Sequence, residues 1–263
     1  LDVVTSDGEF RSCSQTRHAE LFDAVRGTQG QHGIITRASV ALTPAPSAAR
    51  SYQLRYHDLG TFLGDQGRLV HDRRFDHVLG RADYGEGAGW HFVLEALATF
   101  SPPEEPDDRL LLDGLGHARG TEQIDASSYL DFLYRLDPVE ALLRSAGSWQ
   151  NQPHPRCNVL LPGRHAETVI SDVLDSLTPD DIGVGGSVLI YSIPTARLAA
   201  PHMPKARDAL TVVFGLQRTA PLDDPQTLNR MRRANAELHA RAGRLGGASY
   251  AYGPTHTSVR APA

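Results

Sequence analysis

A glycine-rich segment is the first place where residue type and spacing could support chemistry. Gly27-Thr-Gln-Gly30-Gln-His-Gly33 puts three glycines at three-residue spacing, directly before Ile34 and Ile35. Glycine accepts positive φ and lets a ligand approach bare backbone. Nucleotide cofactors use such contacts, because main-chain groups often hold their pyrophosphate. On these residues alone, a cofactor-binding loop and an ordinary loop both stay open.

The histidines raise the question of a metal site. His71-Asp72 and Asp76-His77 supply four possible ligands within seven residues. Two arginines stand between the pairs and would oppose a divalent cation, and no His-Glu-x-x-His motif occurs. The pattern therefore favours a solvated polar turn, and we expect no metal. His91 and Glu95 lie four residues apart on a predicted strand, as surface or pocket-lining residues.

Nucleophilic hydrolysis and dinucleotide binding of the Rossmann type have little support. No Gly-x-Ser-x-Gly motif is present, and Gly183-Val-Gly185-Gly186-Ser187 precedes a strand, whereas a dinucleotide fingerprint follows one. Cys13 and Cys157 are too few for a disulfide framework and are expected to be separate, buried thiols.

Composition argues against a disordered, a nucleic-acid-binding and a membrane-spanning protein. The chain has 263 residues, 26 Lys+Arg against 31 Asp+Glu and 40% hydrophobic residues, which is enough for a folded core. The mildly acidic balance predicts no nucleic-acid partner, and no apolar run is long enough to span a membrane. No targeting signal is visible in the sequence, so we expect a cytoplasmic rather than a secreted location. Leu1 itself falls in a strand-like run, which suggests that the natural N-terminus lies upstream.

The sequence also predicts the strands and helices that position these residues, and their pattern changes after residue 46. Residues 1–46 predict a hairpin, a helix over Arg17–Arg26 and a strand over Ile34–Leu42. Later segments alternate paired strands with single helices, which predicts an α+β fold with an antiparallel sheet. The expected strands are Tyr52–Tyr56, Phe75–Tyr84, Trp90–Phe100, Asn158–Leu161, Ser187–Ile193 and Leu210–Leu216, and the expected helices are Leu59–Arg74, Tyr129–Tyr134, Val139–Ala146, Glu167–Leu177 and Pro225–Leu245.

Five segments, in order, resemble the cytokinin dehydrogenases of the vanillyl-alcohol-oxidase, or PCMH-type, flavoprotein superfamily. They are Leu1-Asp-Val-Val-Thr with Leu21-Phe-Asp-Ala-Val-Arg-Gly27, Gly30-Gln-His-Gly-Ile-Ile-Thr-Arg37, Phe75-Asp-His-Val78, Ser128-Tyr-Leu-Asp-Phe-Leu133 and Trp149…Pro153-His-Pro155-x-x-Asn158. The resemblance runs from residue 1 to about residue 250. It implies an FAD-dependent oxidoreductase that transfers a hydride from a small amine or alcohol substrate to flavin N5, with oxygen or a quinone-like compound as electron acceptor.

The resemblance also implies site residues. Gly30, Gly33, Ile34 and Ile35 would contact FAD, and Tyr250 matches a tyrosine near the flavin. Asn158 matches a substrate-pocket asparagine, although a plain strand-end asparagine is the alternative. Arg156 and Tyr191 are further pocket candidates. No residue of this chain is assigned as catalytic with certainty.

Two departures from the family pattern concern the substrate. Arg156 stands where the family has an aromatic residue after Pro-His-Pro, which suggests a different or anionic substrate. Leu79 stands where the family has an acidic residue, so a substrate-binding carboxylate is missing. Both changes put cytokinin itself in doubt.

The resemblance divides the chain into three parts. Residues 1–46 would be the C-terminal part of a PCMH-type FAD-binding domain, 47–248 a substrate (cap) domain with a large antiparallel sheet covered by helices, and 249–263 a return toward the FAD domain. The family's N-terminal FAD subdomain is not in this sequence, and we expect it as a possible partner, without which FAD would bind poorly. The alternatives are a berberine-bridge-like or sugar oxidase, and a non-catalytic ligand-binding cap fragment.

Overall fold

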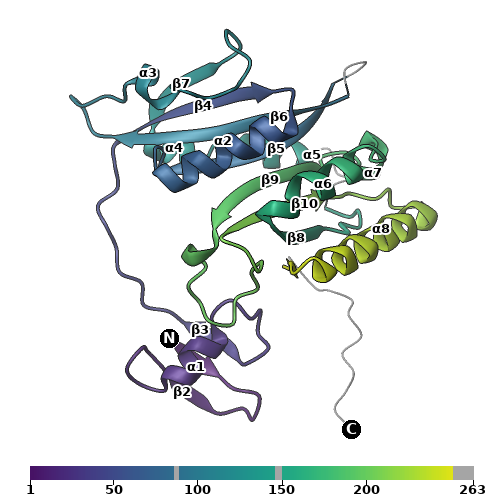
Figure 1. Ribbon diagram of the computed structural model, residues 1–263. Helices are drawn as coiled ribbons and strands as arrows, with labels where there is room; N and C mark the ends of the chain where they lie inside the picture. The colour runs from purple at the N-terminus through teal and green to yellow at the C-terminus, as the bar shows by residue number, and fades with distance from the viewer. Residues whose placement is uncertain (86–88, 146–149, 251–263) are drawn as a thin grey trace.

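Two β-sheets of unequal size organise the chain, and an extended segment joins them (Figure 1). The computed structural model describes residues 1–85, 89–145 and 150–250. In the small sheet, β1 (Asp2–Val4) pairs antiparallel with both β2 (Phe10–Ser12) and β3 (Ile34–Arg37). Helix α1 (Ala19–Val25) packs against it around Val3, Cys13 and Val25, which is a very small core.

The large sheet has eight strands in the order β11-β8-β10-β9-β5-β6-β4-β7, and every neighbouring pair is antiparallel. This confirms the expected α+β class and the large antiparallel sheet. The strands are β4 (Ala48–Tyr56), β5 (His77–Gly85), β6 (Gly89–Phe100), β7 (Gln123–Ser128), β8 (Cys157–Pro162), β9 (Ser187–Pro194), β10 (Leu210–Gln217) and β11 (Ala248–Ser249).

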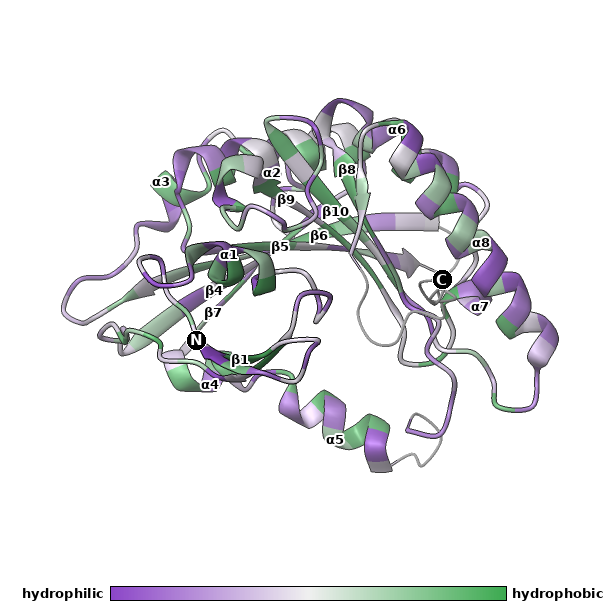
Figure 2. Cartoon of the chain, turned by 90° about the horizontal axis from the view of Figure 1, so that it is seen from below, coloured by the Kyte–Doolittle hydropathy of each residue, from purple (hydrophilic) through white to green (hydrophobic). Residues whose placement is uncertain are grey.

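Three long helices cover one face of this sheet. They are α2 (Leu59–Asp72), α6 (Gly163–Leu174) and α8 (Pro225–Arg244), and Figure 2 shows them on one side with the short helices α4 and α5 on the other. Side-chain caps fix the starts of α2 and α8, where Asp58 accepts from Thr61 N at 2.7 Å and Asp224 from Thr227 N at 2.9 Å. The main hydrophobic core lies between these helices and the sheet.

The short elements account for most differences from the predicted ones. The strand predicted over Ile34–Leu42 ends at Arg37, because residues 38–47 run extended and exposed with two prolines and no ladder. Strand β7 is missing from the prediction, since all six of its residues are exposed and show no apolar alternation. The other short elements are α3 (Asp108–Leu111), α4 (Tyr129–Leu133), α5 (Asp137–Ser145), α7 (Pro179–Ile182) and a 3-10 turn at Thr195–Arg197.

The predicted boundary after residue 46 falls within the extended segment 38–47. The three-part division stays a prediction, and residues 251–263 of its last part lie outside the described residues. Within the described part of the chain, no helix has both the length and the apolar character needed to cross a membrane.

Candidate functional site

Polar residues gather on the face of the large sheet that α2, α6 and α8 leave uncovered. Side chains alternate between faces along a strand. In β8, Cys157, Val159 and Leu161 belong to the core under the helices, so Asn158 points to the other side. We call that side the open face. The same alternation brings Gln53, Arg81, Asp83, Glu95, Tyr191, Gly215 and Gln217 to it from five other strands.

Asn158 is the best-defined predicted residue on the open face. It is only 4% exposed, and its Oδ1 accepts from Gln217 Nε2 at 2.9 Å. Its Nδ2 is buried without a hydrogen-bond partner among the described residues. Gly215 lies opposite in register, and a Cβ built there would come within 2.5 Å of the Asn158 Oδ1. The glycine thus makes room for the amide, and the unpaired Nδ2 can donate to a ligand.

Tyr250 lies next to Asn158 at the edge of the large sheet. Its backbone N–H donates to the Asn158 carbonyl at 3.0 Å, which continues the pairing of β11 with β8. Tyr191 is also on the open face. It lies on β9, two strands away from β8, and is opposite Val213 of β10. Arg156 is exposed just before β8, and its backbone N–H donates to His154 O at 2.8 Å. Four predicted residues therefore lie on or beside one end of this sheet.

The other half of the open face carries charged pairs that the sequence did not single out. Arg81 donates through Nε to both oxygens of Asp83, at 3.1 and 3.0 Å, and through a second nitrogen to Gln53 at 3.2 Å. Arg135, just beyond α4, pairs with Glu95 at 2.6 Å. The available signal was weak, because apolar residues such as Leu79 and Val93 interrupt the polar ones on the same face of β5 and β6.

Leu79 and Glu95 lie opposite each other in register on β5 and β6. The open face therefore has a carboxylate beside the position where the family pattern has one. His91 also belongs to this face, opposite Asp83, and loss of hydration lowers its pKa from the ordinary value. This end of the face is polar with both signs of charge.

The predicted cofactor residues belong to the small sheet. Gly33 has φ of 144°, and a Cβ there would stand 2.7 Å from Val3 Cγ1, so packing against β1 already requires a glycine. Gly30 has φ of 83° and more space around it. Ile34 and Ile35 are 60% and 42% exposed and present apolar surface. A flat, apolar cofactor ring fits such a surface, and the open backbone at Gly30 fits a polar part.

No hydrogen bond or ion pair among the described residues joins this segment to Asn158. The small sheet instead meets the large-sheet part at the loop between β9 and β10. There Met203 lies against Gly27, with 3.0 Å from its Cβ to a Cβ built on the glycine, and the rings of His32 and His202 are 5.9 Å apart. The two groups of predicted residues thus occupy separate sheets.

The two cysteines and Asp76 have structural surroundings. Cys13 and Cys157 are separate, buried thiols, as predicted, and burial raises the pKa of Cys157 to about 12. Asp76 accepts from the backbone N–H and the hydroxyl of Thr99, both at 2.7 Å. In the described ranges, no cluster of three or more His, Cys, Asp or Glu could hold a metal ion.

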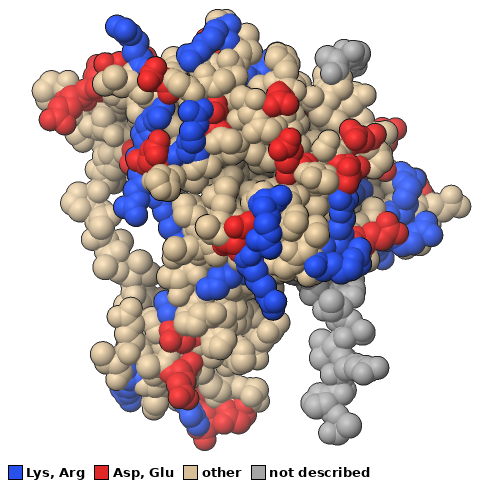
Figure 3. Space-filling model, viewed as in Figure 1, with Lys and Arg blue, Asp and Glu red and all other residues tan. Residues whose placement is uncertain are grey.

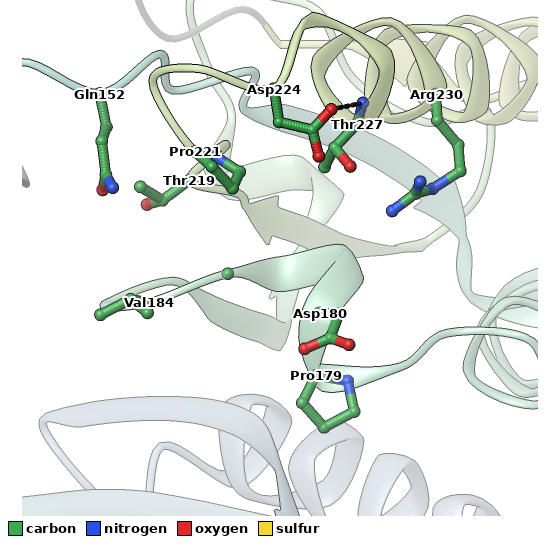
Figure 4. A pocket seen from close by; sticks show the side chains of 10 residues that line it. Gln152, Pro179, Asp180, Val184, Thr219, Pro221, Asp224, Thr227 and Arg230 are labelled. Carbon is green, nitrogen blue, oxygen red and sulfur yellow. Dashed lines mark hydrogen bonds between the residues drawn. The ribbon is translucent and has the colours of Figure 1, made fainter.

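A cavity of about 520 Å³ lies beyond the Pro153-His154-Pro155 segment, at the end away from Asn158. Figure 4 shows its walls: Gln152 and Thr219 on one side, Pro179, Asp180 and Val184 on another, and the start of α8 with Asp224 and Arg230. Thr219 also approaches His154 Nδ1 at 3.3 Å. The cavity supports the segment that leads to Asn158, but it contains none of the predicted pocket residues.

Comparison with known proteins identifies relatives. A family model described as "Cytokinin dehydrogenase 1, FAD and cytokinin binding" matches residues 92–260. An "uncharacterized oxidoreductase ORF5 in fasciation locus" of Rhodococcoides fascians is 39% identical over 251 residues, which cover 95% of this chain and 56% of the relative. Cytokinin dehydrogenase 5 of Oryza sativa subsp. japonica is 30% identical, with 99% and 55% covered.

Two solved structures share the fold. One is 6-hydroxy-D-nicotine oxidase from Arthrobacter nicotinovorans, with a TM-score of 0.55 and 22% identity over 92% of this chain and 53% of that one. The other is xylooligosaccharide oxidase from Myceliophthora thermophila C1, with a TM-score of 0.58 and 14% identity over 95% and 55%. The chain therefore spans about half the length of the relatives it matches.

Proposed function

The chain belongs to the cytokinin dehydrogenase family, and on that premise we propose that it is the substrate-facing part of an FAD-dependent oxidoreductase. The reaction would remove a hydride from a small amine or alcohol. The flavin supplies the redox chemistry when bound, as the acceptor of that hydride. This chain's own residues then have to bind the substrate, orient it and exclude water.

The amide of Asn158 is the observation that carries this proposal. Gln217 fixes the side chain through Oδ1, and Nδ2 stays buried with no partner among the described residues. An unpaired buried donor costs free energy, so a ligand acceptor at this point would be stabilised. The amide would hold the substrate's polar group beside the bond that is broken.

Cofactor contacts are proposed for the glycine segment and for Tyr250. The exposed surface of Ile34 and Ile35, with Gly30 and Gly33, would contact FAD, and the place of Tyr250 beside Asn158 supports a position near the flavin. The family match supports FAD as the cofactor.

The substrate is proposed to be a small polar molecule with an anionic group. Arg156 is exposed beside Asn158, and Tyr191 lies two strands away on the same face. The cation at 156 and the apolar Leu79 favour a substrate other than cytokinin itself. We propose oxygen or a quinone-like compound as the electron acceptor, and a cytoplasmic location.

A second FAD-binding body, such as the relatives' N-terminal FAD subdomain, is proposed as a partner on the side of the open face. Figure 2 shows α4 and α5 on that side, and their large apolar side chains are mostly exposed. An exposed apolar surface of this kind marks an interaction site. The exposed large apolar residues of this stretch are Leu130, Leu133, Tyr134, Leu136, Val139 and Leu142.

The experiment is substrate-dependent reduction of an electron-accepting dye by the chain in excess FAD. Cytokinins, small alcohols and amines, and oligosaccharides would be compared, each with and without a carboxylate. The Asn158→Ala variant should lose about tenfold or more in kcat/KM, which corresponds to one buried hydrogen bond of about 1.4 kcal/mol. Asn229→Ala, an exposed residue of α8, is the control and should match the parent. Equal rates in both variants would contradict the role of Asn158.

A further inference from the structure

A groove of about 480 Å³ runs between α6 and α8, on the helix-covered side of the large sheet. Its volume falls within the range of small-molecule sites. Its floor is apolar and consists of Val173, Leu177, Leu216, Ala234 and Leu238. It lies on the side of the sheet opposite the open face, so it is separate from the site proposed above.

Arginines line the edges of the same groove. Arg230, Arg241 and Arg244 come from one stripe of α8, and Arg218 comes from the segment directly after β10. Figure 3 shows basic side chains gathered over α8, near the right edge of the molecule. Two carboxylates, Asp181 and Glu237, also line it, so the four arginines leave an excess of two positive charges in a protein whose net charge is −5.

Arg218 is unusual because it is buried. It is only 3% exposed, and the one hydrogen bond its side chain makes in the described structure is from Nη1 to the backbone oxygen of Asp181 at 3.0 Å. Its Nε is buried with no partner among the described residues. A buried guanidinium that hydrogen-bonds no carboxylate is costly, and a bound anion would offset that cost.

The other arginines differ in how fully they are paired. Arg230 lies 3.4 Å from Asp181, and Arg241 pairs with Asp172 outside the groove. The side chain of Arg244 makes no ion pair or hydrogen bond with any described residue, and neither does the side chain of Glu237. Arg218 and Arg244 therefore remain available among the residues that line the groove.

We propose that this groove binds a small amphipathic anion, a carboxylate with an apolar chain or ring. The head group would lie against Arg218 and Arg244, where charge-assisted hydrogen bonds are strong. The apolar body would cover the floor formed by Leu177, Leu216 and Leu238. Neither the family description nor the names of the relatives assign a ligand to this side of the sheet.

Isothermal titration of the full chain with decanoate tests the proposal, and it needs neither FAD nor turnover. Decan-1-ol serves as the neutral ligand of equal chain length, and inorganic phosphate as the anion without an apolar body. We expect decanoate to bind at one saturable site at least tenfold more tightly than either. Equal binding of decanoate and decanol would overturn the role of the arginines. Equal binding of decanoate and phosphate would overturn the role of the floor.

Variants locate the site. Arg244→Gln, at an exposed position, should weaken decanoate binding about tenfold, and Arg218→Gln should weaken it more if the variant folds. Arg233→Gln removes the same charge from α8 outside the groove and should change binding by less than twofold. Absence of saturable decanoate binding, or equal losses in the Arg244 and Arg233 variants, would overturn the proposal. If the parent chain binds decanoate but reduces no dye, the proposed function fails and the groove proposal stands.

Discussion

The two faces of the large sheet use the same strands for different purposes. Toward α2, α6 and α8, the alternate residues are apolar and fully buried, as at Leu94, Ile190 and Phe214. Toward the open face, amides, charged pairs and a glycine stand among apolar residues such as Val93 and Val213. The first set of residues supports the fold, and the polar members of the second set supply the groups that can contact a ligand. Substitutions on the helix-covered face should therefore act mainly on stability, whereas substitutions on the open face should also act on the chemistry.

The largest expected effect lies on the helix-covered face. Phe214 is fully buried in the middle of β10, and Phe214→Ala should lower the free energy of unfolding by about 3–5 kcal/mol. Urea unfolding followed by circular dichroism measures this. Asn158→Ala on the adjacent strand should cost less than about 1.5 kcal/mol, as expected for one net hydrogen bond. Similar losses in the two variants would break the distinction between the faces.

Gly215→Ala should produce the next largest effect. The added methyl group would crowd the Asn158 and Gln217 amides on the open face. The new Cβ would stand 2.5 Å from Asn158 Oδ1 and 3.1 Å from Gln217 Nε2, so the amide pair has to move. We expect a loss of about 1–3 kcal/mol in stability and a loss of dye-reducing activity. Retained activity would show that the position of the Asn158 amide is not critical.

Each face of the sheet carries a histidine that should make the stability of the chain depend on pH. Burial lowers the pKa of His239, whose Nε2 lies 3.5 Å from Cys157 Sγ on the helix side, and of His91 on the open face. The unfolded chain therefore takes up these protons first as the pH falls below about 6.5. Stability should be full above that pH and decline below it. Urea midpoints between pH 8 and pH 5 test this, and His239→Gln should flatten the decline, whereas an unchanged slope would contradict it.

The smallest effect is expected from a matched glycine on α2. Gly64 has nothing within 4 Å of a Cβ placed on it, in contrast to Gly215. Gly64→Ala should therefore stabilise the chain by about 0.4–1 kcal/mol, since alanine restricts the unfolded chain and favours a helix. Thermal unfolding measures the gain. A destabilised Gly64→Ala variant would mean that space alone does not explain the difference between the two glycines.

The sequence predicted the elements with strong periodicity and missed those without it. The strand over Ser187–Ile193 and the helix over Pro225–Leu245 agree with β9 and α8 to within a residue, because long apolar patterns define them. The polar β7 has no such pattern and depends on its pairing with β4. Asn158 was identified by a family motif, but Gly215 and Gln217 were not. Their role arises from the register of β8 with β10, which joins residues 57 or more positions apart in the sequence.

The central claim is that this chain presents a flavin- and substrate-facing surface. A difference-absorbance titration of the chain with FAD tests it most directly, by following the flavin band near ~450 nm. Because the chain spans only about half of its relatives, we predict weak but saturable binding, weakened further when Ile34 and Ile35 are both replaced by serine and unaffected by Arg233→Gln. A flavin spectrum that stays the same at every protein concentration would contradict the account.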